Sequence, residues 1–315
     1  MKIFVTGATG FIGRYLVSEL LDQGYHVKIL SRSKKKTIPQ TEQIIGDITK
    51  PDTFTDELSD VDVVFHNAAY AMDHGKKQDF FSINVQGTRN VADACITHGI
   101  NRLIYTSSAG VYGYPKEGTI ITEETEKKPL NLYQKTKWLG EIVLKEYESL
   151  QVSAIRPPLV FGPGSPALQI AFEKLKNNKF PYIGSGEQQL PIVHPSDVAQ
   201  CMRLMMEKDT VGDVFNVVGF QVSIKKFMET ISAKTNLSPP QKHVPYSLAY
   251  TAAFFSELFS SDPNLTRFRV KSLGCTRLIS AEKAEKQLGF TPEYDFDKTV
   301  DDIVHWYQTN FSKNS

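Results

Sequence analysis

The sequence predicts an α/β protein with a doubly wound parallel sheet followed by a smaller C-terminal α/β domain. Over roughly the first 160 residues, short β-branched runs alternate with stretches whose apolar residues recur at helical spacing, as in strands joined by crossover helices. The chain has 315 residues, of which 41% are hydrophobic. A chain of this length and composition can bury the hydrophobic core that such a sheet and a second domain need. We expect residues 1–161 to form the first domain, residues 191–218 to return to it, and residues 162–315 to form the second.

The first strand-to-helix junction is rich in glycine. Residues 2–6 form a β-branched run, and helical spacing begins at residue 11, so that Gly7, Gly10 and Gly13 lie at the turn. The free N–H groups and the dipole at the start of a helix bind a pyrophosphate. Gly7 permits the tight turn, Gly10 lets the backbone approach the phosphates, and Gly13 lets helix and strand pack closely. The turn therefore predicts a dinucleotide cofactor.

A basic segment follows the second predicted strand, residues 26–30. In folds of this kind an acidic residue near this place binds the ribose hydroxyls of NAD, whereas an arginine accommodates the 2′-phosphate of NADP, and here the residue is Arg32. We therefore expect NADP(H) to be preferred, with NAD(H) as the second cofactor. In the alternative interpretation, Arg32 and residues 34–36 form a basic loop in solvent.

Further strands continue the alternation, and ligands bind beyond the carboxyl ends of such strands. Ser107 and Ser108 directly follow one of them and are placed where this kind of sheet holds its chemistry. The expected strands are residues 44–47, 61–69, 102–106, 152–156 and 214–218, and a long helix is expected over residues 78–99.

Tyr133 and Lys137 begin a predicted amphipathic helix and share one of its faces. A nearby ammonium group stabilises a phenolate and lowers the tyrosine pKa from about 10, which suits the tyrosine to general acid–base work. Two other Tyr-x-x-x-Lys patterns lack this setting. Residues 112–116 span a turn with glycine and proline, and residues 294–298 lie far from any strand end.

Several motifs together resemble the extended short-chain dehydrogenase/reductase family, and the match spans nearly the whole chain. The pattern is most similar to that of members resembling dihydroflavonol reductases and 3β-hydroxysteroid dehydrogenases. The motifs are T-G-A-T-G-F-I-G at residues 6–13, N-V-Q-G-T at 84–88, Y-Q-K-T-K at 133–137, R-P-P-L-V-F-G-P-G at 156–164, V-H-P-S-D at 193–197 and L-G-F-T-P at 288–292.

The resemblance implies a Rossmann-type first domain, a substrate-binding second domain and a set of site residues. Tyr133 would protonate the reacting oxygen, Lys137 would lower the pKa of that tyrosine and hold the nicotinamide ribose, and Ser108 would hydrogen-bond the same oxygen. No metal is expected. The cofactor-binding residues that it implies are Gly7, Thr9, Gly10, Phe11, Ile12, Arg32, Asp47, Ile48, Asn67, Ala68, Ala69, Asn84, Thr106, Ser107, Tyr133, Lys137 and Pro157.

These observations favour an NADP-dependent oxidoreductase acting on an uncharged, largely apolar carbonyl compound or secondary alcohol. Pro157 and Pro158 stand where sugar-nucleotide enzymes of the family usually carry an asparagine, and Leu190 stands where such enzymes carry a diphosphate-binding arginine. Arg267 and Arg269 could substitute for that arginine. Two alternatives stay open: a nucleotide-sugar epimerase or dehydratase with the same Ser-Tyr-Lys set, and a non-catalytic NADP-binding sensor or scaffold.

The composition argues against a nucleic-acid-binding, zinc-binding, secreted or membrane-spanning protein. The net charge of +1 gives no general reason to bind nucleic acid. The three cysteines lie far apart in the sequence, which indicates reduced thiols, no zinc site and a cytoplasmic location. No apolar run is long enough to span a membrane, and the first strand begins too early to leave room for a signal peptide. The resemblance makes a homodimer plausible.

His194 and residues 246–259 are expected to contribute to the structure and not to the chemistry. His194 lies beside an apolar run and is expected to be a hydrogen-bonded core residue, because a lone histidine in such a place is seldom a catalyst. Residues 246–259 are the most apolar stretch of the chain and are expected to form a buried helix of the second domain. The alternatives for this helix are the wall of an apolar pocket and contact with a membrane surface.

Overall fold

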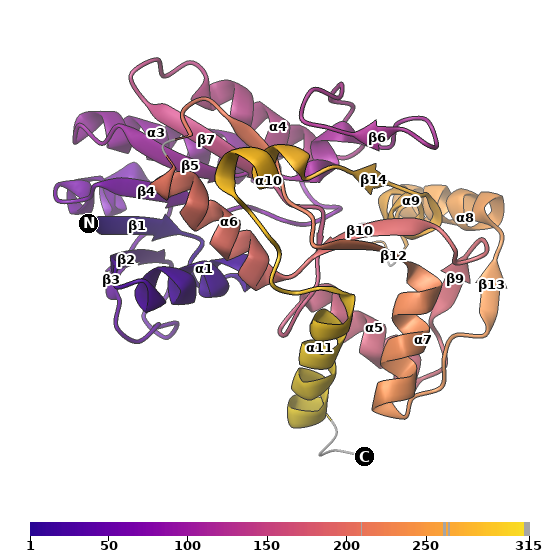
Figure 1. Ribbon diagram of the computed structural model, residues 1–315. Coiled ribbons are helices and arrows are strands. Elements are labelled where there is room, and N and C mark those ends of the chain that lie inside the picture. The colour runs from indigo at the N-terminus through magenta and orange to yellow at the C-terminus, as the bar shows by residue number, and fades with distance from the viewer. Residues whose placement is uncertain (209, 261–262, 264, 312–315) are drawn as a thin grey trace.

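The computed structural model describes residues 1–208, 210–260, 263 and 265–311. Seven parallel strands form one sheet in the order β11-β7-β5-β4-β1-β2-β3, and the order reverses direction at β1, next to β4 (Figure 1). This is the predicted doubly wound α/β fold, and the fold class is confirmed. The strands are β1 (Lys2–Thr6), β2 (His26–Ser31), β3 (Glu42–Ile45), β4 (Val63–His66), β5 (Arg102–Thr106), β7 (Gln151–Arg156) and β11 (Val214–Asn216).

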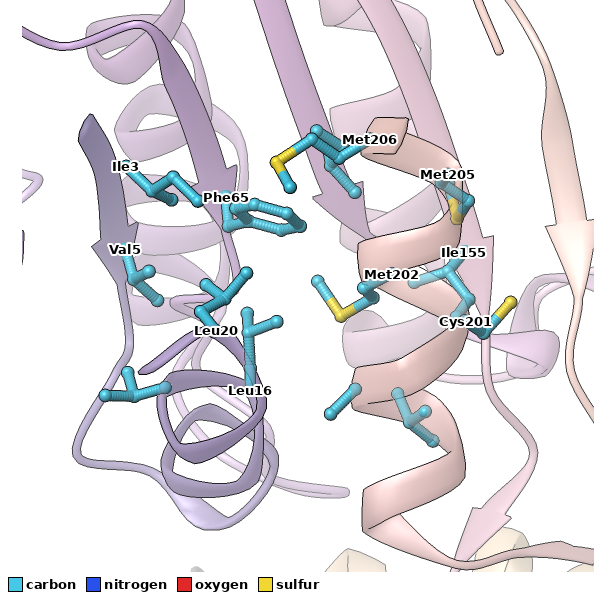
Figure 2. Packing of buried hydrophobic residues seen from close by; sticks show 14 of the residues in the cluster. Ile3, Val5, Leu16, Leu20, Phe65, Ile155, Cys201, Met202, Met205 and Met206 are labelled. Atoms are coloured by element: carbon cyan, nitrogen blue, oxygen red, sulfur yellow. The ribbon is translucent and has the colours of Figure 1, made fainter. Parts of the chain in front are cut away.

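Helices cover both faces of this sheet because its strands bury side chains on both sides. Along β1, Ile3 and Val5 pack with α1 and α6, whereas Phe4, which points to the opposite face, packs with α3 and the end of α4. Figure 2 shows the first layer, in which Met202 and Met206 of α6 lie toward Leu20 of α1 and the sheet. The helices are α1 (Phe11–Asp22), α3 (Gly87–Thr97), α4 (Leu132–Leu144) and α6 (Pro195–Glu207).

Some predicted elements differ in extent from those of the structure. The strand expected over residues 61–69 is β4 and ends at His66, because the following residues leave the sheet to border a cavity. The helix expected over residues 78–99 is built from α2 (Lys77–Phe81), a π-helical turn (Ser82–Gln86) and α3. The π turn lets a helix change the direction of its side chains without breaking.

The remaining chain forms a smaller layer of short strands and helices at the carboxyl side of the large sheet (Figure 1). Residues 189–193 pair within a small three-stranded sheet, while α6 and β11 lie with the seven-stranded sheet. The division into two domains stays a prediction. The strands here are β8 (Leu159–Val160), β9 (Pro181–Ile183), β10 (Gln189–Val193), β12 (Phe220–Ser223), β13 (Lys242–Val244) and the pair β6 (Ile120–Ile121) and β14 (Leu278–Ile279). The helices of this layer are α5 (Pro166–Lys176), α7 (Ile224–Thr235), α8 (Tyr246–Phe259), α9 (Arg267–Gly274) and α11 (Phe296–Phe311). Helix α10 (Glu282–Leu288), by contrast, packs against α6 and β11 of the large sheet.

The expectation that residues 246–259 form a buried helix is wrong in one respect, because helix α8 forms but lies on the surface. Only Ala249 and Ala253 are buried, one turn apart, where their small side chains let α8 approach α9 and β9. Leu258 and Phe259 are 63% and 81% exposed. No residue of α8 lines the main cavity described below, and contact with a membrane surface stays a prediction. Within the described chain, no helix combines the length and apolarity needed to traverse a bilayer.

His194 has the structural setting that its sequence context predicts. It is buried, its Nε2 lies 3.1 Å from a carboxylate oxygen of Asp302, and its ring stacks on Tyr294 with centroids 3.7 Å apart. Its Nδ1 also accepts a hydrogen bond from the backbone N–H of Ser196 at the start of α6. The side chain therefore joins α6 to the C-terminal helix and lines no part of the main cavity.

Candidate active site

A cavity of about 990 Å³ runs along the carboxyl ends of the central strands and continues into the smaller layer. Every residue that the sequence assigns to catalysis or to the cofactor lines it, with the exception of Asn84. Its volume is at the upper end of the range for small-molecule sites. The switch in strand order beside β1 is the place where folds of this class bind their ligands.

The glycine turn has the close packing that the sequence predicts. Gly7 has a φ of +67°, and a Cβ at this position would lie 2.6 Å from the backbone nitrogen of Ala68. A Cβ at Gly13 would lie 2.1 Å from the carbonyl oxygen of Gly7. Helix α1 begins at Phe11, and no side chain caps its start. The first N–H groups of α1 thus stay available for a pyrophosphate, so the turn fits a dinucleotide.

Two cations border the cavity beyond β2. Arg32 is exposed at the end of this strand, and Lys36 lies on the following loop. Neither forms an ion pair with another described residue. The sequence does not distinguish Lys36 as a cofactor ligand, because it is one of three consecutive lysines. Both cations suit the additional phosphate of NADP, and no acidic side chain follows β2 in the place where it would bind the ribose hydroxyls of NAD.

A buried hydrogen-bonded histidine fixes the end of β4. The ring nitrogens of His66 lie 2.8 Å from Oγ1 of Thr6 and 2.9 Å from Oγ1 of Thr88. Burial, together with the nearby charge of Lys137, lowers the pKa of His66 to about 3, so the ring is neutral. The side chain of Asn67 donates to the carbonyl of Gly7 at 3.3 Å, which holds the β4 end against the glycine turn.

Asn84 corrects the predicted set of cofactor-binding residues. Its side chain is buried behind the cavity, where its Oδ1 accepts a hydrogen bond of 2.7 Å from the N–H of Tyr70. Its Nδ2 donates to the carbonyl of Tyr70 and to Oγ1 of Thr136. Both ends of the amide are therefore used within the protein. The residue ties the π turn to α4 and to the loop after β4, and does not line the cavity.

Ser108, Tyr133 and Lys137 come together beside the predicted nicotinamide end of the cavity. The Oγ of Ser108 accepts a hydrogen bond of 3.0 Å from the N–H of Gly110, and the Ser108 and Tyr133 side chains hydrogen-bond each other. Tyr133 lies in the first turn of α4, which begins where Asn131 caps the helix. Lys137 is buried one turn later, with its Nζ 4.1 Å from the ring centre of Tyr105.

The predicted lowering of the Tyr133 pKa by Lys137 is wrong for this structure. Burial raises the pKa of Tyr133 to about 12, and the hydrogen bond with Ser108 only partly opposes this rise. Burial also lowers the pKa of Lys137 to about 7, against the attraction of Glu141. Burial, and not the charge of Lys137, therefore sets the direction in which the pKa of Tyr133 shifts. Tyr133 carries its proton at neutral pH, which is the form that can donate to a carbonyl oxygen.

A buried ion pair supports this site, and sequence reasoning missed it. Arg156 binds Glu141 through two hydrogen bonds, of 2.9 Å from Nε and 2.5 Å from Nη2. Ser107 also donates to Glu141, and Nη1 of Arg156 donates to the hydroxyl of Tyr112 at 2.7 Å. Glu141 lies one turn beyond Lys137 on α4, a spacing that could have marked it as part of the same buried face.

The part of the cavity beyond Ser108, Tyr133 and Lys137 is lined mainly by apolar side chains. Side chains from α7 and α9 line it, among them Phe227, Met228 and Phe268. Arg269 also borders this part and pairs with Asp73, with 2.8 Å between Nε and Oδ2. No spacing in the sequence could have grouped these residues, because they come from separate segments around residues 70, 228 and 270.

Comparisons with known proteins agree with this architecture. Residues 3–218 match the NAD dependent epimerase/dehydratase family. The chain is 31% identical over 325 residues to the decarboxylating sterol-4-alpha-carboxylate 3-dehydrogenase of Bos taurus, covering 95% of this chain and 90% of that protein. It is 28% identical over 320 residues to the 2-alkyl-3-oxoalkanoate reductase of Stenotrophomonas maltophilia, covering 95% and 97%.

A solved structure supports the fold alone. The UDP-glucose 4-epimerase of Thermotoga maritima superposes with a TM-score of 0.82 at 21% identity, covering 98% of this chain and 99% of that one. The family match and the relative at 31% identity confirm the predicted resemblance. The chain belongs to the NAD dependent epimerase/dehydratase family and is an NAD(P)-dependent oxidoreductase of the extended short-chain dehydrogenase/reductase type.

Proposed function

We propose that this protein uses NADP(H) to transfer a hydride between the nicotinamide and a carbonyl or secondary alcohol of a largely apolar small molecule. The observation that carries the proposal is one cavity in which Ser108, Tyr133 and Lys137 stand between a glycine turn and an apolar compartment. The names of two relatives, a sterol carboxylate dehydrogenase and an alkyl-oxoalkanoate reductase, support a substrate of this kind.

The chain's own residues divide the work of the reaction. When bound, the nicotinamide supplies or accepts the hydride. In reduction, Tyr133 donates its proton to the carbonyl oxygen, and Ser108 donates a hydrogen bond to the same oxygen as negative charge develops there. Lys137 lies one helical turn from Tyr133, where it can hold the nicotinamide ribose. The glycine turn would bind the pyrophosphate, while Arg32 and Lys36 would face the 2′-phosphate.

A redox screen tests the proposal directly. The protein with NADPH is offered a panel of apolar ketones, and with NADP⁺ a panel of secondary alcohols, while the absorbance of the nicotinamide is followed. Turnover of at least one compound supports an oxidoreductase. Tight binding of NADPH without any redox change across both panels would favour the sensor or scaffold alternative.

We expect NADPH to bind more tightly than NADH, and Arg32→Ala to weaken NADPH binding about tenfold or more. A charge-assisted contact contributes roughly 1.5–3 kcal/mol, although Lys36 will keep part of the attraction. Fluorescence titration with both cofactors measures the difference. Lys34→Ala is the matched control, since Lys34 lies on the same loop but does not line the cavity. An unchanged NADPH affinity in Arg32→Ala would show that the arginine only faces solvent.

Nucleotide-sugars are expected not to bind. Leu190 is 1% exposed in β10, in the place of the diphosphate-binding arginine. Arg267 and Arg269, the two candidate substitutes, are paired with Glu257 and Asp73. A diphosphate without a cationic partner would lose several kcal/mol. Calorimetric titration of the NADPH-saturated protein with UDP- and GDP-sugars measures this, and micromolar binding or an epimerised product would establish the sugar alternative.

The proposal also includes a cytoplasmic location and a homodimeric assembly. All three cysteines are free thiols, with Cys95 and Cys201 buried, which fits the reducing cytoplasm. A homodimer is expected from the family resemblance. Ultracentrifugation of the purified protein measures the assembly state.

A further inference from the structure

A second, smaller cavity adjoins the catalytic residues. It has a volume of about 150 Å³ and is lined by Ser108 and Tyr133, which also line the large cavity. Phe268 and Ser272 of α9 border both spaces as well. A group in the small cavity would therefore be attached close to the carbon whose oxygen Tyr133 protonates. We call this small cavity the rear pocket.

Arg277 lines the rear pocket and lacks an acidic partner. It is 9% exposed, and no described carboxylate forms an ion pair with it. Its Nη2 donates to the carbonyl of Ala109 at 2.7 Å, and its guanidinium lies over the ring of Tyr114, 5.1 Å from the centre. Its Nε is buried without a hydrogen-bond partner. Burial lowers the pKa of Arg277, as expected for a cation that no anion compensates.

A second unpartnered donor lines the same pocket. The Oε1 of Gln134 accepts a hydrogen bond of 2.7 Å from the N–H of Leu130, which orients the amide, while its buried Nε2 has no partner. Buried polar groups nearly always have hydrogen-bond partners, and leaving a donor unpaired costs about 1–3 kcal/mol. Two unpaired donors, one of them cationic, in one pocket beside a candidate proton donor point to an anionic acceptor.

The size and charge of the rear pocket select the anion. One guanidinium compensates a single negative charge, and its planar N–H groups match a carboxylate. The other walls include Leu159, Leu190 and Pro191, which offer nothing to a second charge. A volume of about 150 Å³ holds a carboxylate with a few carbon atoms and excludes a nucleoside diphosphate.

We infer that Arg277 and Gln134 bind a carboxylate of the substrate, which is an oxo acid or the corresponding hydroxy acid. The carboxylate lies within a few bonds of the reacting carbonyl, and the rest of the molecule is apolar. In reduction the carbonyl carbon gains the hydride of NADPH and the oxygen gains the proton of Tyr133, which gives a hydroxy acid and NADP⁺. The carboxylate is unchanged. This inference rests on the proposed function and replaces the sequence expectation of an uncharged substrate.

The experiment compares acids with their esters. Wild-type protein saturated with NADPH is offered freshly prepared 2-oxodecanoate and 3-oxodecanoate, each beside its methyl ester. We expect one acid to be preferred over its ester about 10- to 100-fold in kcat/KM, the range of a charge-assisted hydrogen bond. In Arg277→Gln the preference should fall to near unity through a higher KM for the acid, and Arg277→Lys should keep part of it. Because the first comparison uses wild-type protein, it does not depend on the folding of a variant.

Arg267→Gln is the matched control, since Arg267 lies on α9 but lines neither cavity. It should keep the full preference for the acid. Equal turnover of acids and esters by the wild type would overturn the inference and leave the proposed function standing. If neither acids, esters nor neutral ketones change the redox state of NADPH, the proposed function fails as well. Micromolar binding of a UDP-sugar that Arg277→Gln abolishes would assign Arg277 to a diphosphate instead.

Discussion

Replacing Tyr133 by phenylalanine should lower kcat by a factor of about 10²–10⁴ while NADPH binds as before. This factor is typical for the loss of a general acid–base group. The change removes only the hydroxyl. The ring stays in place at the start of α4, and the cofactor contacts of the glycine turn are untouched. The rate of NADPH oxidation with an accepted substrate and a fluorescence titration of NADPH measure the two quantities separately.

Tyr294→Phe is the control for this loss, because Tyr294 also belongs to a Tyr-x-x-x-Lys pattern but stacks on His194 away from the cavity. It should keep the wild-type kcat. If Tyr133→Phe retained full turnover, the proton would have to come from another group, and Ser108 would be the next candidate.

Replacing Glu141 by alanine should lower the free energy of unfolding by about 3–5 kcal/mol, the range for removing one partner of a buried ion pair. Arg156 and Glu141 are 4% and 6% exposed in their side chains, so water cannot replace the lost carboxylate. Ser107 loses an acceptor at the same time. Urea unfolding followed by circular dichroism measures the change.

Glu146→Ala provides the comparison within the same region of the chain. Glu146 pairs with Arg89 at 2.9 Å, but the two side chains are 53% and 37% exposed. An exposed pair contributes about 0–1 kcal/mol, so this variant should unfold close to the wild type. If both variants lost a similar free energy of unfolding, the buried Glu141–Arg156 pair would contribute no more to stability than an exposed ion pair.

The sequence predicted the sheet and most of the candidate site because both depend on local patterns. The strand at residues 102–106 ends where small residues begin at Ser107, and the glycines at 7 and 13 have close contacts that exclude a side chain. Tyr133 and Lys137 share a helix face, so spacing alone placed them together. Each of these features is visible within a few consecutive residues.

Other features depend on tertiary packing, which spacing does not reveal. Arg277 lines the rear pocket because β14 brings it beside Ala109, and nothing near it in the sequence indicates burial without a carboxylate. Helix α8 is the most apolar stretch of the chain, which favours burial, yet the fold covers only the side that carries Ala249 and Ala253. The pKa of Tyr133 depends on the atoms around it, and these come from distant segments.

The position of α6 in the chain has a consequence for synthesis. Residues 1–161 contain six of the seven strands of the large sheet, yet the apolar face of α1 is covered by α6, which ends at Glu207 (Figure 2). The roughly 50 residues between β7 and the end of α6 take several seconds to translate at about 5–20 residues per second. During that interval Leu16, Leu20 and Phe65 lack their methionine partners, and the nascent chain presents an apolar surface to which chaperones can bind.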